Sequence, residues 1–281
     1  MSACTSVLSD TNIAGRQVNI SGVEQTLYIP LAARIYASEK FPNFFYDHQA
    51  LSLKPYLSID KIKNNSNEYF YMASVCRQHS IDQKIKKFLQ KQSRSNVVFL
   101  GAGLETAYHR LNNSQANFYQ LDLPKVIKIR KELLGSGKNE KLIAADMFSL
   151  DWTTQINTLL PTLLVVAGVF QYFPKDKIVT LIKKIKTLFP QGELIFDATN
   201  SQGLKIANQY VKKAGNDNAQ MHFTLDNPPE FAHLTDTKLI DVSGFFAAAL
   251  KNCHNLKLIT KIFMYFADKL HRTIIVHLQL N

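Results

Sequence analysis

Cysteine is scarce in this 281-residue chain, which has only Cys4, Cys76 and Cys253. These three residues form neither a C-x-x-C pair nor an even disulfide framework. A reducing compartment suits such a protein best, so we expect a cytoplasmic location. The histidines and cysteines also contain no H-E-x-x-H motif and no paired-cysteine ligand set, and we predict no metal site.

Glycine and proline are also infrequent, and long hydrophobic runs are missing. Eleven glycines and nine prolines exclude a collagen-like or low-complexity sequence, while 46% hydrophobic residues indicate a globular protein. The longest apolar candidate, residues 162–173, is shorter than the roughly 20 residues that cross a bilayer, so we expect no membrane segment. The first ten residues lack a basic region followed by an apolar one, and we expect no secretory signal.

Positive charge is in excess, with a formal net charge of +11 and a sequence pI near 9.4. Nucleic acid or an anionic surface would attract such a chain. The lysines are nevertheless spread along the sequence without a block of five like charges, and neither an RNP1-type motif nor a zinc-finger spacing occurs. We therefore favour solvated, lysine-rich helix faces and keep a nucleic-acid-binding protein as the alternative.

The order of expected elements is typical of an α/β fold. Periodicity is weak over the first ~70 residues, where only helical fragments are expected, and it sharpens after Tyr69; from residue 96 short apolar strands alternate with amphipathic helices. The run at 162–169 is continuously apolar, which suits a parallel strand covered on both faces. The expected strands are 96–100, 117–121, 141–145, 162–169 and 193–198. The expected helices are 30–39, 47–54, 81–89, 125–134, 177–189 and 204–214.

The last part of the chain changes character. Residues 256–266 and 271–280 are both rich in β-forming side chains and are separated by a short link, which predicts an antiparallel hairpin that closes the sheet. One large domain with an appendage is expected at this length. We therefore predict a doubly wound α/β sheet within 76–281, a helical extension at 1–75, and an insertion at about 201–250.

A glycine turn follows the first expected strand and carries the clearest chemical signal. Gly101 and Gly103 would let a ligand approach the backbone closely. About 20 residues later Asp122 ends the next strand, where its carboxylate can accept hydrogen bonds from ribose hydroxyls. Asp146 ends the third strand on the same rim. Thr106 stands where the dinucleotide fingerprint has its third glycine, so a nucleoside ligand without a pyrophosphate is favoured over a nicotinamide-dependent dehydrogenase.

Three segments resemble the leucine carboxyl methyltransferase family of S-adenosylmethionine-dependent enzymes, which includes bacterial polyketide O-methyltransferases. They read NVVFLGAGLETAYHRL, FYQLDLPKVIKIRK and PTLLVVAGVFQYF, and the resemblance covers roughly residues 20–200. It implies a class I methyltransferase fold, Rossmann-like, with a seven-stranded sheet whose last strand is antiparallel and a helical lid. The implied cofactor is S-adenosyl-L-methionine and the product is S-adenosyl-L-homocysteine.

The resemblance also implies roles for individual residues. The expected cofactor-binding set is Arg77, Gly101, Ala102, Gly103, Asp122, Leu123, Asp146, Met147 and Ala167. Within it, Arg77 would grip the cofactor's carboxylate, for which a guanidinium fork is suited. The glycines would face the methionine part, Asp122 the ribose, and Asp146 the adenine amino group with Met147 beside the base.

The acceptor side is expected to involve Arg34, Tyr172 and Asn200. By the resemblance Tyr172 lies near the transferred methyl, and we predict it to be the catalytic residue, orienting the acceptor through its hydroxyl. A carboxylate acceptor is ionised at neutral pH and needs no general base, whereas a phenol would benefit from one. His79 and His222 are alternative bases, and Asp197 is an alternative lining residue of the acceptor pocket.

One departure from the family pattern bears on the acceptor. Many members read A-E-G-V or A-E-C-V where this chain reads Val166-Ala167-Gly168-Val169, so a cofactor-side glutamate is missing. The loss argues against the branch that modifies protein phosphatases and favours methyl transfer to a small-molecule acceptor. The alternative is a basic nucleic-acid-binding or RNA-methylating protein of the same fold. The sequence does not indicate the oligomeric state.

Overall fold

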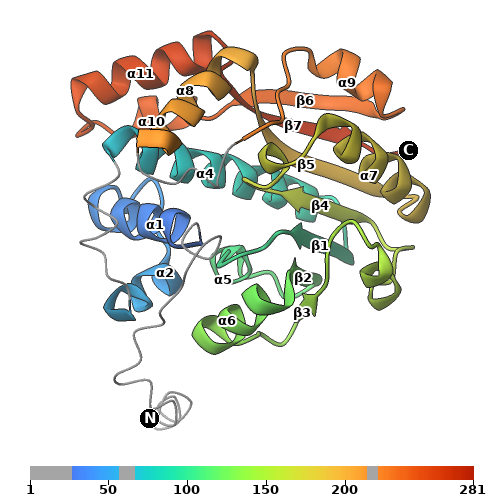
Figure 1. The fold of residues 1–281 in the computed structure, drawn as a ribbon. Coiled ribbons are helices and arrows are strands. Elements are labelled where there is room, and N and C mark those ends of the chain that lie inside the picture. The colour runs from blue at the N-terminus through green and yellow to red at the C-terminus, as the bar shows by residue number, and fades with distance from the viewer. Residues whose placement is uncertain (1–26, 57–66, 214–220) are drawn as a thin grey trace, which may run out of the picture.

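A seven-stranded sheet forms the centre of the protein in the computed structural model, which describes residues 27–56, 67–213 and 221–281 (Figure 1). The strand order is β3-β2-β1-β4-β5-β7-β6, and β7 runs antiparallel to both of its neighbours while the other pairs are parallel. The strands are β1 Ser95–Leu100, β2 Ala116–Asp122, β3 Glu140–Ala144, β4 Thr162–Val166, β5 Gly192–Thr199, β6 Lys238–Gly244 and β7 Thr273–Gln279. The expected seven-stranded sheet with an antiparallel last strand is thereby confirmed.

Helices cover both faces of the sheet, and most lie within a few residues of the expected positions. Figure 1 shows α7 in front of β4 and β5, with α4 on the opposite side. The α-helices are α1 Tyr28–Lys40, α2 His48–Ser52, α4 Glu68–Gln90, α5 Ala107–Leu111, α6 Pro124–Leu134, α7 Lys175–Leu188, α8 Ser201–Lys213, α9 Pro228–Leu234, α10 Ala247–Asn252 and α11 Leu258–Lys269. The short 3-10 helices are η2 Lys54–Tyr56, η3 Asp151–Gln155 and η4 Phe170–Tyr172.

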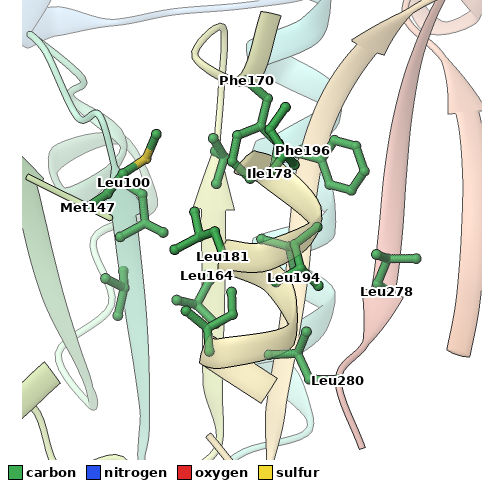
Figure 2. Close-up of a cluster of buried hydrophobic side chains, with 14 of the residues drawn as sticks. Leu100, Met147, Leu164, Phe170, Ile178, Leu181, Leu194, Phe196, Leu278 and Leu280 are labelled. Carbon is green, nitrogen blue, oxygen red and sulfur yellow. The ribbon is translucent and has the colours of Figure 1, made fainter. Parts of the chain in front are cut away.

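Alternation along the strands builds two hydrophobic cores. Because successive side chains of a strand point to opposite faces, Val98 and Leu100 of β1 pack on the α7 side, whereas Val97 and Phe99 pack on the α4 side. Figure 2 shows the first core around α7, with side chains from β1, β4, β5 and β7. Its labelled members are Leu100, Met147, Leu164, Phe170, Ile178, Leu181, Leu194, Phe196, Leu278 and Leu280. The continuously apolar β4 is buried on both faces, as its sequence predicts.

The N-terminal helices pack on α4 rather than standing apart. α4 begins at the N-cap Asn67, whose side chain accepts a hydrogen bond from the Phe70 N–H, and it continues for 23 residues. Small residues of α1, among them Ala33 and Ala37, let α1 lie against Tyr71 and Val75 of α4. The expected boundary at residues 75 and 76 therefore falls inside a continuous helix, and residues 1–26 of the expected extension lie outside the described residues.

The expected C-terminal hairpin is wrong in its first arm. Residues 258–269 form α11, and β7 pairs antiparallel with β6 and β5 instead. In α11 the buried residues Thr260, Met264 and Ala267 recur at the helical spacing, but the exposed side chains are apolar as well, with Phe263 50% exposed. That all-round apolar composition hides the helical period. β6, largely exposed and without an apolar run, offers little signal for a strand.

Among the helices of the described segments, none is both long enough and apolar enough to span a bilayer.

Candidate functional site

The carboxyl ends of the parallel strands bring most of the expected cofactor residues to one edge of the sheet. Asp122 pairs with Ala144, and Leu100 pairs with Leu121, so Gly101 follows in the same row as Asp122. Ligands bind at this edge in open α/β sheets, beside the position where the strand order reverses. Here that position lies between the neighbouring strands β1 and β4.

The loop after β1 is shaped by two glycines with left-handed backbone angles. Gly101 has φ +75° and Gly103 has φ +50°, a region that side-chain-bearing residues rarely adopt. A Cβ atom on Gly101 would lie 2.5 Å from a Val169 methyl, and one on Gly103 would lie 3.1 Å from a Leu27 methyl. Glycine therefore suits both positions, because it adopts these backbone angles without strain and has no Cβ to crowd Val169 or Leu27.

Asp122 is fixed at the end of β2 by two backbone donors. One of its carboxylate oxygens accepts the Gly103 N–H at 2.7 Å and the other accepts the Leu123 N–H at 2.8 Å. Burial raises the pKa of Asp122 above its ordinary value, against the lowering effect of these two bonds. A carboxylate has about four acceptor positions, so two remain for a ligand diol. Leu123 beside it is 51% exposed.

The segment after β3 presents one exposed carboxylate and one buried thioether. Asp146 is exposed, and its side chain accepts the Phe148 N–H at 2.9 Å. Met147 is buried, and its carbonyl accepts the Trp152 indole N–H at 3.0 Å. These contacts fix the backbone of the segment while leaving the Asp146 carboxylate accessible.

Arg77 reaches the same edge from α4. Its Nη1 donates to the Asp197 carboxylate at 3.2 Å, and the other oxygen of Asp197 accepts the Gly168 N–H at 2.5 Å. Gly168 has φ +72°, and a Cβ there would lie only 2.7–3.1 Å from the Arg77 guanidinium. The guanidinium thus lies directly over a position that only glycine leaves open. Ala167, the preceding residue, is partly exposed.

Arg34 lies deeper than a residue that meets an acceptor directly. Its side chain is 4% exposed, and Nη2 donates to the Leu104 carbonyl at 2.7 Å. It also forms ion pairs with Glu105 at 3.4 Å and Asp47 at 3.6 Å. The described contacts of Arg34 all go to other residues of the chain, and its contact with an acceptor stays a prediction.

Arg110 of α5 is the centre of a buried charge cluster that sequence reasoning missed. It donates two hydrogen bonds to Asp82 and one each to Asp47, Glu105 and Thr106, at 2.7–3.0 Å. We call these residues together with Arg34 the Arg110 cluster. It joins α1, the cap of α2, α4 and α5 to the glycine loop. Its signal in the sequence is the pair Glu105 and Arg110 directly after the glycine turn.

Charge in the Arg110 cluster is nearly balanced, with three carboxylates facing two guanidinium groups. Burial alone would raise the pKa of Asp47 and of Glu105, but Arg34 and Arg110 outweigh it and lower both pKa values. Glu105 also accepts the N–H groups of Thr106 and Ala107, each at 2.7 Å. These bonds satisfy the first turn of α5 and hold the end of the glycine loop.

The acceptor-side candidates are dispersed. Tyr172 is half-buried at the end of η4, directly after β4. Asn200 directly precedes α8: its side-chain Oδ1 accepts the Gly203 N–H at 2.8 Å, and its side-chain Nδ2 donates to the Leu270 carbonyl at 3.0 Å. His79 stacks on Phe44 with ring centroids 4.5 Å apart. The roles of these residues toward an acceptor stay predictions.

Two further observations bear on alternative chemistry. Burial lowers the pKa of His79, against an opposing effect of Asp82, and His222 is exposed. Across the residues that the structure describes, no group of three or more histidine, cysteine, aspartate or glutamate side chains is arranged to hold a metal ion.

Known proteins resemble this chain in sequence. It is 22% identical over 204 residues to the tetracenomycin polyketide synthesis O-methyltransferase TcmP of Streptomyces glaucescens, covering 72% of this chain and 76% of that one. It is 24% identical over 244 residues to the S-adenosyl-L-methionine-dependent methyltransferase dpfgK of Gibberella zeae, covering 79% and 82%. The solved structure of the mitomycin 7-O-methyltransferase MmcR superposes with a TM-score of 0.49 at 13% identity, covering 88% of this chain and 60% of that one.

A family-level comparison completes these findings. The family model for leucine carboxyl methyltransferase matches residues 23–186, more than half of the 281 residues, and this range includes the glycine loop, Asp122 and Arg77. This chain belongs to the leucine carboxyl methyltransferase family.

Proposed function

We propose that this protein transfers the methyl group of S-adenosylmethionine to an oxygen of a small-molecule acceptor, at a carboxylate, and releases S-adenosylhomocysteine. The observation that carries the proposal is the row of groups at the carboxyl edge of the sheet. There the glycine loop follows β1, the Asp122 carboxylate ends β2 and bonds to that loop, and the Arg77 guanidinium reaches Asp197 of β5 from α4.

The residues present fit this cofactor in their donor and acceptor chemistry. The buried Nε of Arg77 has no hydrogen-bond partner among the described residues, as a group that awaits an anionic ligand would. Asp122 retains acceptor positions for the ribose hydroxyls, and Asp146 offers an exposed acceptor for the adenine amino group. We therefore propose these three side chains as the principal polar contacts of the cofactor, with the glycine loop beside its methionine part.

Mechanism follows from what the chain itself must supply. The sulfonium of the bound cofactor brings an activated methyl group, so the protein contributes alignment and the exclusion of water. A carboxylate acceptor arrives ionised at neutral pH, and no side chain has to remove a proton from it. We propose that the Tyr172 hydroxyl orients this acceptor, and that Asn200 and Arg34 shape its pocket from α8 and α1.

Other parts of the proposal rest on the relatives and on composition. The name of TcmP assigns that enzyme to polyketide synthesis, and we propose an acceptor of comparable chemistry for this chain. We also propose a cytoplasmic location and a lid formed by the helices before the sheet. The nucleic-acid alternative gains no support from the matches described above.

The test is a calorimetric titration of the purified protein with S-adenosylhomocysteine, followed by an assay with labelled S-adenosylmethionine. We expect saturable binding and methyl transfer to members of a panel of carboxylic acids, with no transfer to the corresponding amides. The absence of heat and of any thermal shift at millimolar ligand would refute the proposal. Transfer to phenols alone would place the reaction at a different oxygen.

A further inference from the structure

The carboxyl end of β5 holds a charged group, Asp197, to which the proposed function gives no role in binding the cofactor. Asp197 is 6% exposed, and a buried carboxylate is costly unless it is paired. It lies outside residues 23–186, the range matched by the family model. Val166 pairs with Phe196, so the next residues on the two strands, Ala167 and Asp197, are neighbours at the same edge.

We infer that Asp197 binds the ammonium group of the cofactor's amino-acid end, so that Asp197 and Arg77 together form a subsite for a zwitterionic α-amino acid group. The inference rests on the proposed function, since it assigns the methionine end of the same cofactor. It gives a role in ligand binding to a residue that was expected, at most, to line the acceptor pocket.

Hydrogen-bonding capacity supports this assignment. The Asp197 carboxylate uses one acceptor position for the Gly168 N–H and one for Arg77 Nη1, which leaves about two positions open. Arg77 has five N–H donors and uses one of them in its bond to Asp197. Arg77 therefore retains N–H donors for a ligand carboxylate, and Asp197 retains acceptor positions for a ligand ammonium group.

The geometry of the pair matches the ligand. Arg77 and Asp197 are 3.2 Å apart and lie at the strand edge beside the glycine loop, with Arg77 16% exposed. An α-amino acid places its ammonium and carboxylate on one carbon atom, so it needs two opposite charges side by side. The neighbouring position on β4 is Ala167, which contributes no charge. Asp197 is then the acidic group that faces Arg77 at this edge.

The experiment compares three ligands by calorimetry on the full-length protein. S-adenosylhomocysteine carries both charges, its deaminated analogue keeps only the carboxylate, and 5′-methylthioadenosine has neither. For the wild type we expect the deaminated analogue to bind roughly 10- to 100-fold more weakly than S-adenosylhomocysteine, the loss of one charge-assisted hydrogen bond. In Asp197→Asn we expect that preference to shrink to within a few-fold, with the affinity for 5′-methylthioadenosine unchanged.

The matched control is Glu193→Gln. Glu193 is a carboxylate on the same strand, paired with His277 at 2.6 Å, and we expect its substitution to keep the wild-type preference. A role limited to holding Arg77 predicts a different result, namely that Asp197→Asn weakens both charged ligands by the same factor, and this outcome would overturn the inference. Full retention of the preference in Asp197→Asn would overturn it too.

The wild type alone keeps the inference testable when Asp197→Asn does not fold. Equal binding of S-adenosylhomocysteine and its deaminated analogue by the wild type would show that no side chain recognises the ammonium group. If the wild type binds neither S-adenosylhomocysteine nor 5′-methylthioadenosine, the proposed function itself fails. Binding of both ligands without discrimination of the ammonium leaves the proposed function standing and removes only the subsite.

Discussion

Two arginines lie close to the glycine loop and differ in how their donors are used. Arg110 uses all five N–H groups in hydrogen bonds to Asp47, Asp82, Glu105 and Thr106, and its side chain is 6% exposed. Arg77 makes one such bond, to Asp197, and is 16% exposed. A saturated guanidinium has nothing left to offer a ligand, whereas an unsaturated one at a strand edge does. Arg110 is therefore part of the scaffold, and Arg77 is the arginine that we propose for ligand binding.

The largest effect is expected from Arg110→Met. The substitution removes the guanidinium that pairs with the buried carboxylates of Asp47, Asp82 and Glu105. Removing one partner of a buried ion pair lowers the free energy of unfolding by about 3–5 kcal/mol. Urea denaturation should show this loss in the free energy of unfolding. Arg77→Met is the matched control, and we expect a clearly smaller loss from it. Equal losses from the two variants would contradict the distinction drawn above.

Arg77→Ala should change ligand binding instead. We expect the affinity for S-adenosylhomocysteine to fall by about 1.5–3 kcal/mol, the range for a hydrogen bond to a charged group. Calorimetry measures the change, and circular dichroism checks that the variant remains folded. An affinity equal to that of the wild type would remove Arg77 from the cofactor site.

Gly168→Ala tests whether the placement of the Arg77 guanidinium matters. The new Cβ would lie 2.7–3.1 Å from the guanidinium atoms, and an alanine at φ +72° is strained by about 1–2 kcal/mol. We expect a loss of S-adenosylhomocysteine affinity no larger than that of Arg77→Ala. In the double variant the two losses should not add, because both act on one contact. Additive losses would mean that Gly168 acts independently of Arg77.

The smallest expected effect is a change in acid sensitivity. The pKa of Glu105 and that of Asp47 are lowered in the folded state, so their contribution to stability is present above the unfolded values near pH 4 and is lost as the pH falls further. Glu105→Gln should therefore make the unfolding free energy depend less steeply on pH below about pH 4. Urea titrations at several pH values measure the slope, and an unchanged slope would contradict the predicted ionisation.

Much of the fold could be predicted because its strands and main helices carry strong local patterns. β4 is apolar throughout, and α7 has a regular apolar face with lysines opposite, so each indicates its environment without knowledge of the rest. α11 could not be predicted in the same way, because its exposed face is as apolar as its buried one. β6 is an edge strand in which no residue is fully buried, and its pairing with β7 depends on tertiary contacts.

In the candidate site, too, the residues marked by local patterns could be predicted, and those brought together by tertiary contacts could not. Gly101, Gly103 and Asp122 could be predicted because a glycine turn and a carboxylate at strand ends are local signals, and in the structure Asp122 accepts the Gly103 N–H. The ion pair between Asp197 and Arg77 joins residues that are 120 positions apart, so no local spacing in the sequence predicts it. The acceptor side depends on how α1 and α8 pack against the sheet, which local patterns do not specify.

The Arg110 cluster has a consequence for protein engineering. Because one guanidinium links the cap of α2 and the middle of α4 to the loop after β1, the N-terminal helices are not an interchangeable module. A chimaera that takes these helices from a relative must bring a carboxylate at position 47 and another at position 82. Without them Arg110 would keep only its hydrogen bonds to Glu105 and Thr106, and a buried guanidinium would be left undercompensated beside the turn proposed to receive the cofactor.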